Sequence, residues 1–69
     1  MANVAHEVGE ALRKLGDLVG IKYGATPETD RAAEVAVGEA VAAAVASSPE
    51  AEAAVLAVCA AVDGARRTR

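Results

Sequence analysis

The chain has 69 residues, of which 54% are apolar, and a formal net charge of −3 at pH 7. This length allows one domain, and the single hydrophobic core of such a domain rarely contributes more than about 3–5 kcal/mol. The acidic balance argues against nucleic-acid binding by the domain as a whole, because such domains present a basic face. The apolar residues are mostly alanine, with ten valines, four leucines and no phenylalanine or tryptophan, so we expect a thin core.

The sequence also bears on location. Cys59 is the single cysteine and cannot form an internal disulfide, so nothing points to an oxidising compartment. His6 and Glu10 interrupt the N-terminal segment, which excludes a signal-peptide pattern there. The longest uncharged stretches, residues 40–49 and 53–62, have ten residues each, whereas a spanning helix needs about 18 or more apolar residues. We therefore expect a cytoplasmic protein without a membrane span, or one inside a virion or another large cytoplasmic assembly.

A first helix is predicted over residues 3–20. Asn3 is a good N-cap, and the apolar residues that follow it repeat with helical spacing. These residues are Val4, Val8, Ala11, Leu12, Leu15, Leu18 and Val19. Charged residues occupy the opposite side, so the segment is predicted to be an amphipathic helix.

Three glycines lie together at one edge of the apolar stripe of this first helix. Gly9 and Gly16 would allow another backbone to approach closely, although each interior glycine costs about 1 kcal/mol relative to alanine. In the alternative interpretation, Gly20 is the C-cap and the other two are merely tolerated. The only aromatic residue, Tyr23, follows in a connector, where we expect it to fill a helix junction rather than bind a ligand.

The second and third helices have clear starts. The segments Thr26-Pro27-Glu28 and Ser48-Pro49-Glu50 each place a capping hydroxyl before a proline at the first helical position and an acidic residue in the first turn. These signals predict helices over residues 27–47 and 49–65, followed by a short basic tail over residues 65–69.

Both of these helices have two apolar faces. The first face of the second helix comprises Ala33, Val37, Ala40, Val41, Ala44 and Val45, and that of the third helix comprises Val55, Val58, Cys59 and Val62. We expect these first faces to be buried within the chain, with Val58 and Val62 on the principal buried stripe. Apolar residues also occur on the other side of each helix, and helices that are apolar all round are usually buried all round.

Three short helices cannot enclose two of their own members. We therefore expect the second faces to contact a protein partner, through Val35, Gly38, Ala42, Ala46, Leu56 and Ala60. In the alternative interpretation, alanine serves only as an exposed helix former, as in proteins of GC-rich genomes.

The candidates for chemistry are few. His6 and Glu10 lie one helical turn apart, but two exposed ligands do not complete a metal site. Cys59 lies in an apolar run without a base that would activate its thiol. The sequence contains no phosphate-binding loop and no catalytic triad pattern. We therefore predict a non-enzyme without catalytic residues, metal site or cofactor.

Together these features predict an all-α, alanine- and valine-rich fold of three helices, a helical hairpin plus the N-terminal amphipathic helix, completed by partners. The predicted function is that of a helical assembly subunit that docks on itself or on a larger scaffold, for example a phage virion accessory of a GC-rich host. The alternative is a small dimeric adaptor whose basic tail, with Arg66, Arg67 and Arg69, contacts nucleic acid or an acidic protein surface. Three arginines neutralise about three phosphates at most, so such binding would be weak and salt-sensitive.

Overall fold

The computed structural model describes residues 3–68, and this part of the chain contains three helices and no strand. They are α1 (Val4–Val19), α2 (Pro27–Val45) and α3 (Pro49–Arg67). The predicted all-α, three-helix fold is thus confirmed, and the helix ends differ from the predicted ones by two residues at most. Two ends differ by two residues: α2 ends at Val45 instead of residue 47, and α3 continues into the predicted basic tail as far as Arg67.

Local hydrogen bonds explain where α1 begins and ends. The side chain of Asn3 accepts a hydrogen bond from the backbone N–H of His6 at 3.2 Å, which satisfies one of the free amides of the first turn. Gly20 ends the helix with φ 74°, a left-handed conformation that glycine adopts without a steric penalty, and its N–H donates to the carbonyl of Gly16.

The starts of α2 and α3 follow from the two predicted caps. The hydroxyl of Thr26 accepts from the backbone N–H of Thr29, and the hydroxyl of Thr29 accepts from the backbone N–H of Thr26, so the two form a reciprocal capping box. The hydroxyl of Ser48 likewise accepts from the N–H of Ala51 at 3.2 Å. A proline follows each cap at the first helical position, where its missing N–H leaves no hydrogen bond unmade.

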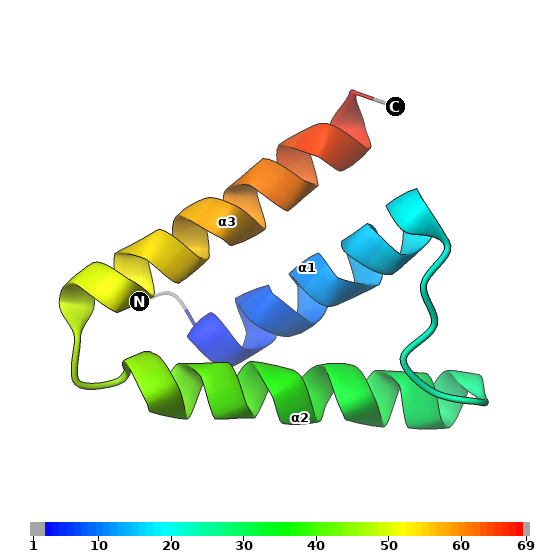
Figure 1. The fold of residues 1–69 in the computed structure, drawn as a ribbon, viewed down its shortest axis with the longest axis horizontal. Helices are drawn as coiled ribbons and strands as arrows, with labels where there is room; N and C mark the ends of the chain where they lie inside the picture. The colour runs from blue at the N-terminus through cyan, green and yellow to red at the C-terminus, as the bar shows by residue number, and fades with distance from the viewer. Residues whose placement is uncertain (1–2, 69) are drawn as a thin grey trace.

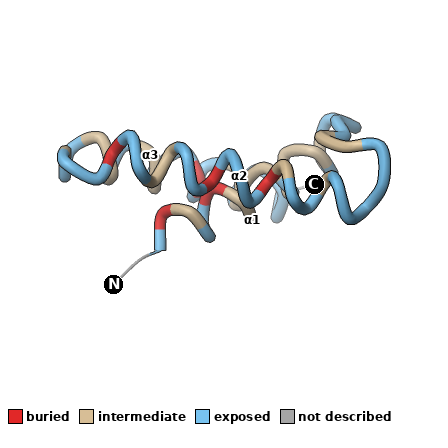
Figure 2. The backbone as a smooth tube through the Cα atoms, turned by 90° about the horizontal axis from the view of Figure 1, so that it is seen from below, coloured by how far each residue is buried: buried red, intermediate tan, exposed pale blue. Residues whose placement is uncertain are grey.

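The three helices lie side by side in one layer, with α1 between α2 and α3 (Figure 1). The molecule measures 33 × 28 × 16 Å along its principal axes, and the view along the layer shows how thin it is (Figure 2). Helices α2 and α3 meet near the turn at residues 46–48 and diverge from there (Figure 1). The turn of the predicted hairpin is therefore present, but α1 separates most of α2 from α3.

A close contact between backbones holds α1 against α2. Gly38 is buried, and a Cβ atom at this position would clash with the backbone carbonyl of Ala5 in α1. The glycine therefore lets the two helices approach more closely than any other residue would allow. Gly9 lies in the same contact, where a Cβ atom would be 3.6 Å from the backbone oxygen of Glu34.

The core is small and lies where α1 begins and α2 ends. Its buried apolar residues are Val4, Val8, Val45 and Cys59. Partly buried residues packed against them are Ala11, Leu12, Val41, Ala42, Ala51, Val55 and Leu56. In a single layer the middle helix α1 is covered on both flanks, and α2 and α3 are each covered mainly on one. Most apolar residues therefore stay partly exposed.

Candidate functional site: an open apolar face

All three helices contribute to one hollow on a broad side of the layer, with a volume of about 260 Å³. We call its lining the apolar face, which consists of Val8, Ala11, Leu12, Leu15, Val41, Val55, Val58, Cys59 and Val62. No charged or hydroxyl-bearing side chain lines it. The hollow is open to solvent, and its lining joins the core to the surface: Val8 and Cys59 are buried core residues, Val58 is exposed, and the other six are half-buried.

Helix periodicity explains why the apolar face forms on one side. With about 100° between successive residues of α1, Val8, Leu12 and Leu15 lie on one side of the helix. Because α2 and α3 occupy the flanks of α1, this side is left for solvent or for another molecule (Figure 1).

The opposite side of the layer is polar. A smaller hollow there lies between α1 and α2, and we call its lining the polar face: Ala5, His6, Gly9, Glu10, Arg31, Glu34, Val35 and Glu39. On this side Arg13 donates to Glu10 at 3.0 Å, and this bond is the main cause that lowers the pKa of Glu10. The layer therefore has one apolar side and one side with charged residues, although α2 and α3 each have two apolar faces in sequence.

The structure corrects the expected burial of Val58. We expected Val58 on the principal buried stripe of the third helix, but it is 63% exposed, while Val55 and Val62 are half-buried. The reason is the single layer, since no helix of this chain covers the side of α3 to which Val58 belongs.

The six residues predicted to contact a partner do not form one surface. Val35, Ala46 and Ala60 are exposed, as a partner contact would require. Gly38, however, faces α1 of the same chain, and Ala42 and Leu56 pack against the internal core. The structure thus uses part of the second apolar faces for internal packing and leaves residues of the first faces open.

The two glycines expected to allow close approach face segments of this chain. At Gly9 the neighbour is the backbone of α2, and at Gly16 a Cβ atom would be 2.8 Å from the backbone oxygen of Ile21 in the connector. Gly20 is the C-cap, as the alternative interpretation proposed.

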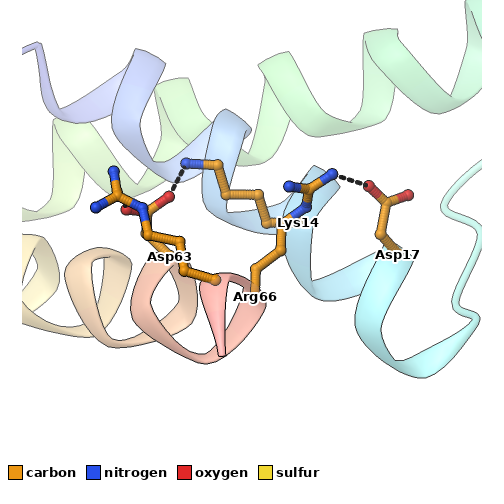
Figure 3. Close-up of polar contacts among 5 residues, drawn as sticks. Lys14, Asp17, Asp63 and Arg66 are labelled. Carbon is orange, nitrogen blue, oxygen red and sulfur yellow. Dashed lines mark hydrogen bonds and ion pairs between the residues drawn. The ribbon is translucent and has the colours of Figure 1, made fainter. Parts of the chain in front are cut away.

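Ion pairs join α1 to α3 on the other flank (Figure 3). Lys14 donates to Asp63, which it reaches across the helix contact, and this hydrogen bond is the main cause that lowers the pKa of Asp63. Arg67 also pairs with Asp63 at 3.1 Å, and Arg66 lies 3.6 Å from Asp17. Two of the three arginines predicted for the tail, Arg66 and Arg67, therefore already have carboxylate partners in the chain. The third, Arg69, lies outside the described residues.

A third hollow, of about 330 Å³, lies under the connector between α1 and α2. Asp30 of α2 accepts hydrogen bonds from the backbone N–H groups of Tyr23 and Gly24, which ties the connector to the helix. The Tyr23 hydroxyl is buried without a hydrogen-bond partner among the described residues. Sequence reasoning placed Tyr23 at a helix junction, and the ring does lie against Gly16 at the end of α1.

Glu34 was not predicted to be part of a site, because it is not paired with Glu39 at catalytic spacing, but it lines both the hollow under the connector and the polar face and is only 3% exposed. Burial raises the pKa of its carboxyl group, the nearby Asp30 raises it further, and Arg13 opposes them. In sequence, Glu34 lies between Arg31 and Glu39 in an alanine-rich helix, a setting that is typical of a solvent-facing residue. No sequence signal therefore distinguished it.

The candidate chemical groups are separated in space. His6 is exposed on the polar face, whereas Cys59 lies across the layer, where burial raises the pKa of its thiol. Among residues 3–68 no three His, Cys, Asp or Glu side chains are grouped so that they could hold a metal ion. No helix in the same range is long and apolar enough to cross a membrane.

The fold and this surface define the class of the chain, a small all-α protein with one amphipathic layer of helices. Comparison with known proteins adds no closer relationship: no family model matches the chain, and neither a curated protein nor a solved structure is significantly similar to it.

Proposed function

We propose that this chain is a non-catalytic helical assembly protein that works by burying its apolar face against a protein. The observation that carries this proposal is the open hollow, to which all three helices contribute only apolar side chains. Contiguous exposed apolar patches are uncommon on monomeric proteins and usually mark interaction sites.

The exposure of individual residues supports this interpretation. Val58 is 63% exposed although it lies within a continuous apolar surface. Fully burying one exposed valine contributes roughly 1.5–3 kcal/mol, so a partner gains free energy by covering Val58 and the half-buried side chains around it. A virion accessory would be one example of such an assembly protein, and that narrower proposal rests on composition alone.

The adaptor alternative has less support. Its predicted contact residues Arg66 and Arg67 are paired with Asp17 and Asp63, and a nucleic acid would have to displace these carboxylates. This competition is weak, because both arginine side chains are more than half exposed, but a short tail still limits binding to about three phosphates.

The proposal can be tested by purifying the tagged full-length chain from the organism that encodes it and identifying every protein that accompanies it. We compare wild type with Val58→Asp on the apolar face and Val35→Asp on the polar face, because both valines are exposed helix residues. A specific companion, including untagged copies of the chain itself, should be lost in the first variant and kept in the second. If wild type carried no companion, or if both variants kept it equally, the proposed function would be wrong.

A further inference from the structure

Resting on the proposed function, we infer that the occupant of the apolar face is a second copy of this chain, packed face to face. Stable domains consist of at least two packed layers of secondary structure. This chain provides one layer, in which α1 lies between α2 and α3 (Figure 1). A second copy related by a two-fold axis would supply the missing layer.

The surface area of the chain agrees with a missing layer of this size. The accessible surface is 4618 Å² for a mass of 6.9 kDa. The usual scaling for compact monomers gives about 4,000 Å² at this mass, so the chain exposes roughly 600 Å² more than expected. If each of two copies buried this excess, the total would be about 1,200 Å², the lower end of the range for stable protein interfaces.

The charge distribution also permits pairing of identical surfaces. In a two-fold interface each patch meets its own copy, so a charged patch would bring like charges together. The apolar face has no charged side chain, while the Lys14–Asp63 ion pair already neutralises its members within one chain. Two copies can therefore make contact without burying an unpaired charge.

The relief of the face is compatible with self-pairing. Val58 is 63% exposed beside a hollow of about 260 Å³, so the same surface carries both a projecting group and a depression. In a two-fold pair, Val58 of each copy would enter the hollow of the other. The other lining residues are one alanine, four valines, two leucines and one cysteine, so the contact would bury no charged or hydroxyl-bearing side chain.

Net charge distinguishes self-pairing from binding to a basic partner. Each copy has a net charge of −3, so two copies repel one another at long range, and added salt screens this repulsion. Dimerisation through the apolar face should therefore strengthen as NaCl rises. A complex with a basic protein should weaken under the same change.

The test is sedimentation equilibrium of the purified full-length chain over a wide concentration range, at low and high NaCl. We expect a monomer–dimer equilibrium that shifts toward dimer with salt, and a melting temperature that rises with protein concentration. Val58→Asp should weaken dimerisation by a factor on the order of 100 or more, because it places a carboxylate in each apolar contact. Val35→Asp, the matched control on the opposite face, should leave the equilibrium nearly unchanged.

Val58→Ser is a second variant, which removes apolar contact without adding charge and should weaken the dimer less than Val58→Asp. If Val58→Asp did not fold, this milder variant would decide the matter. A wild type that sediments as a folded monomer at every concentration would overturn self-pairing, and so would a dimer that neither Val58 variant weakens. If the wild type were monomeric but bound a different protein, and Val58→Asp abolished that binding, the proposed function would stand with that protein as the occupant. If the wild type had no companion, both proposals would fail.

Discussion

The two broad faces of the helical layer differ in the side chains that they present to solvent. On the polar face, Glu10 pairs with Arg13, and charged residues of α1 and α2 surround a small hollow. On the apolar face, nine side chains from three helices line a larger hollow without a polar group among them. The polar face meets water as it is, whereas the apolar face gains free energy only when another surface covers it.

This contrast shows that an amphipathic layer can be built from helices that are only weakly amphipathic. Helix α1 has the strongest segregation of apolar and charged residues, and its position between α2 and α3 gives the whole layer its two sides (Figure 1). Few residues are buried, and they are distributed over all three helices (Figure 2). The middle helix thus determines which sides of its neighbours stay open.

The largest change to this arrangement should come from Gly38→Leu, which acts between the two faces. A side chain at Gly38 clashes with the backbone of Ala5, so α1 and α2 must separate and both faces lose their shape. Overpacking of this kind typically costs about 1–3 kcal/mol, a large part of the stability of a small domain. Thermal denaturation followed by circular dichroism should show a much lower melting temperature, and an unchanged one would contradict the close contact.

Gly64→Leu is the matched control for that experiment. Gly64 also lies inside a helix, but no atom lies within 4 Å of a Cβ placed there. Leucine favours the helix by about 0.8–1 kcal/mol relative to glycine, so this variant should melt at a slightly higher temperature.

The next largest effect is expected from Val45→Ala in the core, compared with Val58→Ala on the apolar face. Val45→Ala removes apolar contacts from the core, where the residue is 9% exposed, and should lower the free energy of unfolding by about 1–2 kcal/mol at any protein concentration. Val58→Ala removes the same atoms from the apolar face and should have little effect in dilute solution. Urea denaturation at low and high protein concentration measures both variants, and equal losses in dilute solution would show that the two valines are equally buried.

A smaller effect is expected from Glu34→Gln on the polar face. Because burial raises the pKa of Glu34 in the folded chain, the folded state binds this proton more tightly than the unfolded state does. Glu34 therefore contributes stability at pH values below its unfolded pKa, and this contribution is lost as pH rises through the folded pKa. Glutamine does not titrate, so the variant should lack this loss and be more stable than wild type near neutral pH. Denaturant titrations across the acidic range measure this, and a wild type that gains stability relative to the variant as pH rises would contradict the prediction.

The smallest effect is expected from Asp63→Asn at the contact between α1 and α3 (Figure 3). Lys14 lowers the pKa of Asp63, so this carboxylate stabilises the fold above its unfolded pKa, and the contribution is lost as pH falls through the folded pKa. The variant should be slightly less stable at neutral pH, with a difference that shrinks in high salt because the pair is partly exposed. Asp17→Asn is the comparison, since its pair with Arg66 is longer, at 3.6 Å, and more exposed, so its effect should be smaller still.

The sequence by itself determined the three helices and, through their caps, where each of them begins. Asn3, Thr26 and Ser48 cap the helices through hydrogen bonds to residues three positions away, and such bonds depend on local order alone. The amphipathic character of α1 was equally readable, because its charged and apolar residues separate clearly at helical spacing.

Only the tertiary structure decided which sides of α2 and α3 are covered. Both helices have apolar residues on two faces, so periodicity could not select one side, and we expected Val58 to be buried and Gly38 to meet a partner. The close contact of Gly38 with Ala5 places α1 between its neighbours, and this contact joins residues 33 positions apart in the chain. Which apolar surface stays open therefore depends on the packing of backbones across the layer, a property that no single helix carries in its own sequence.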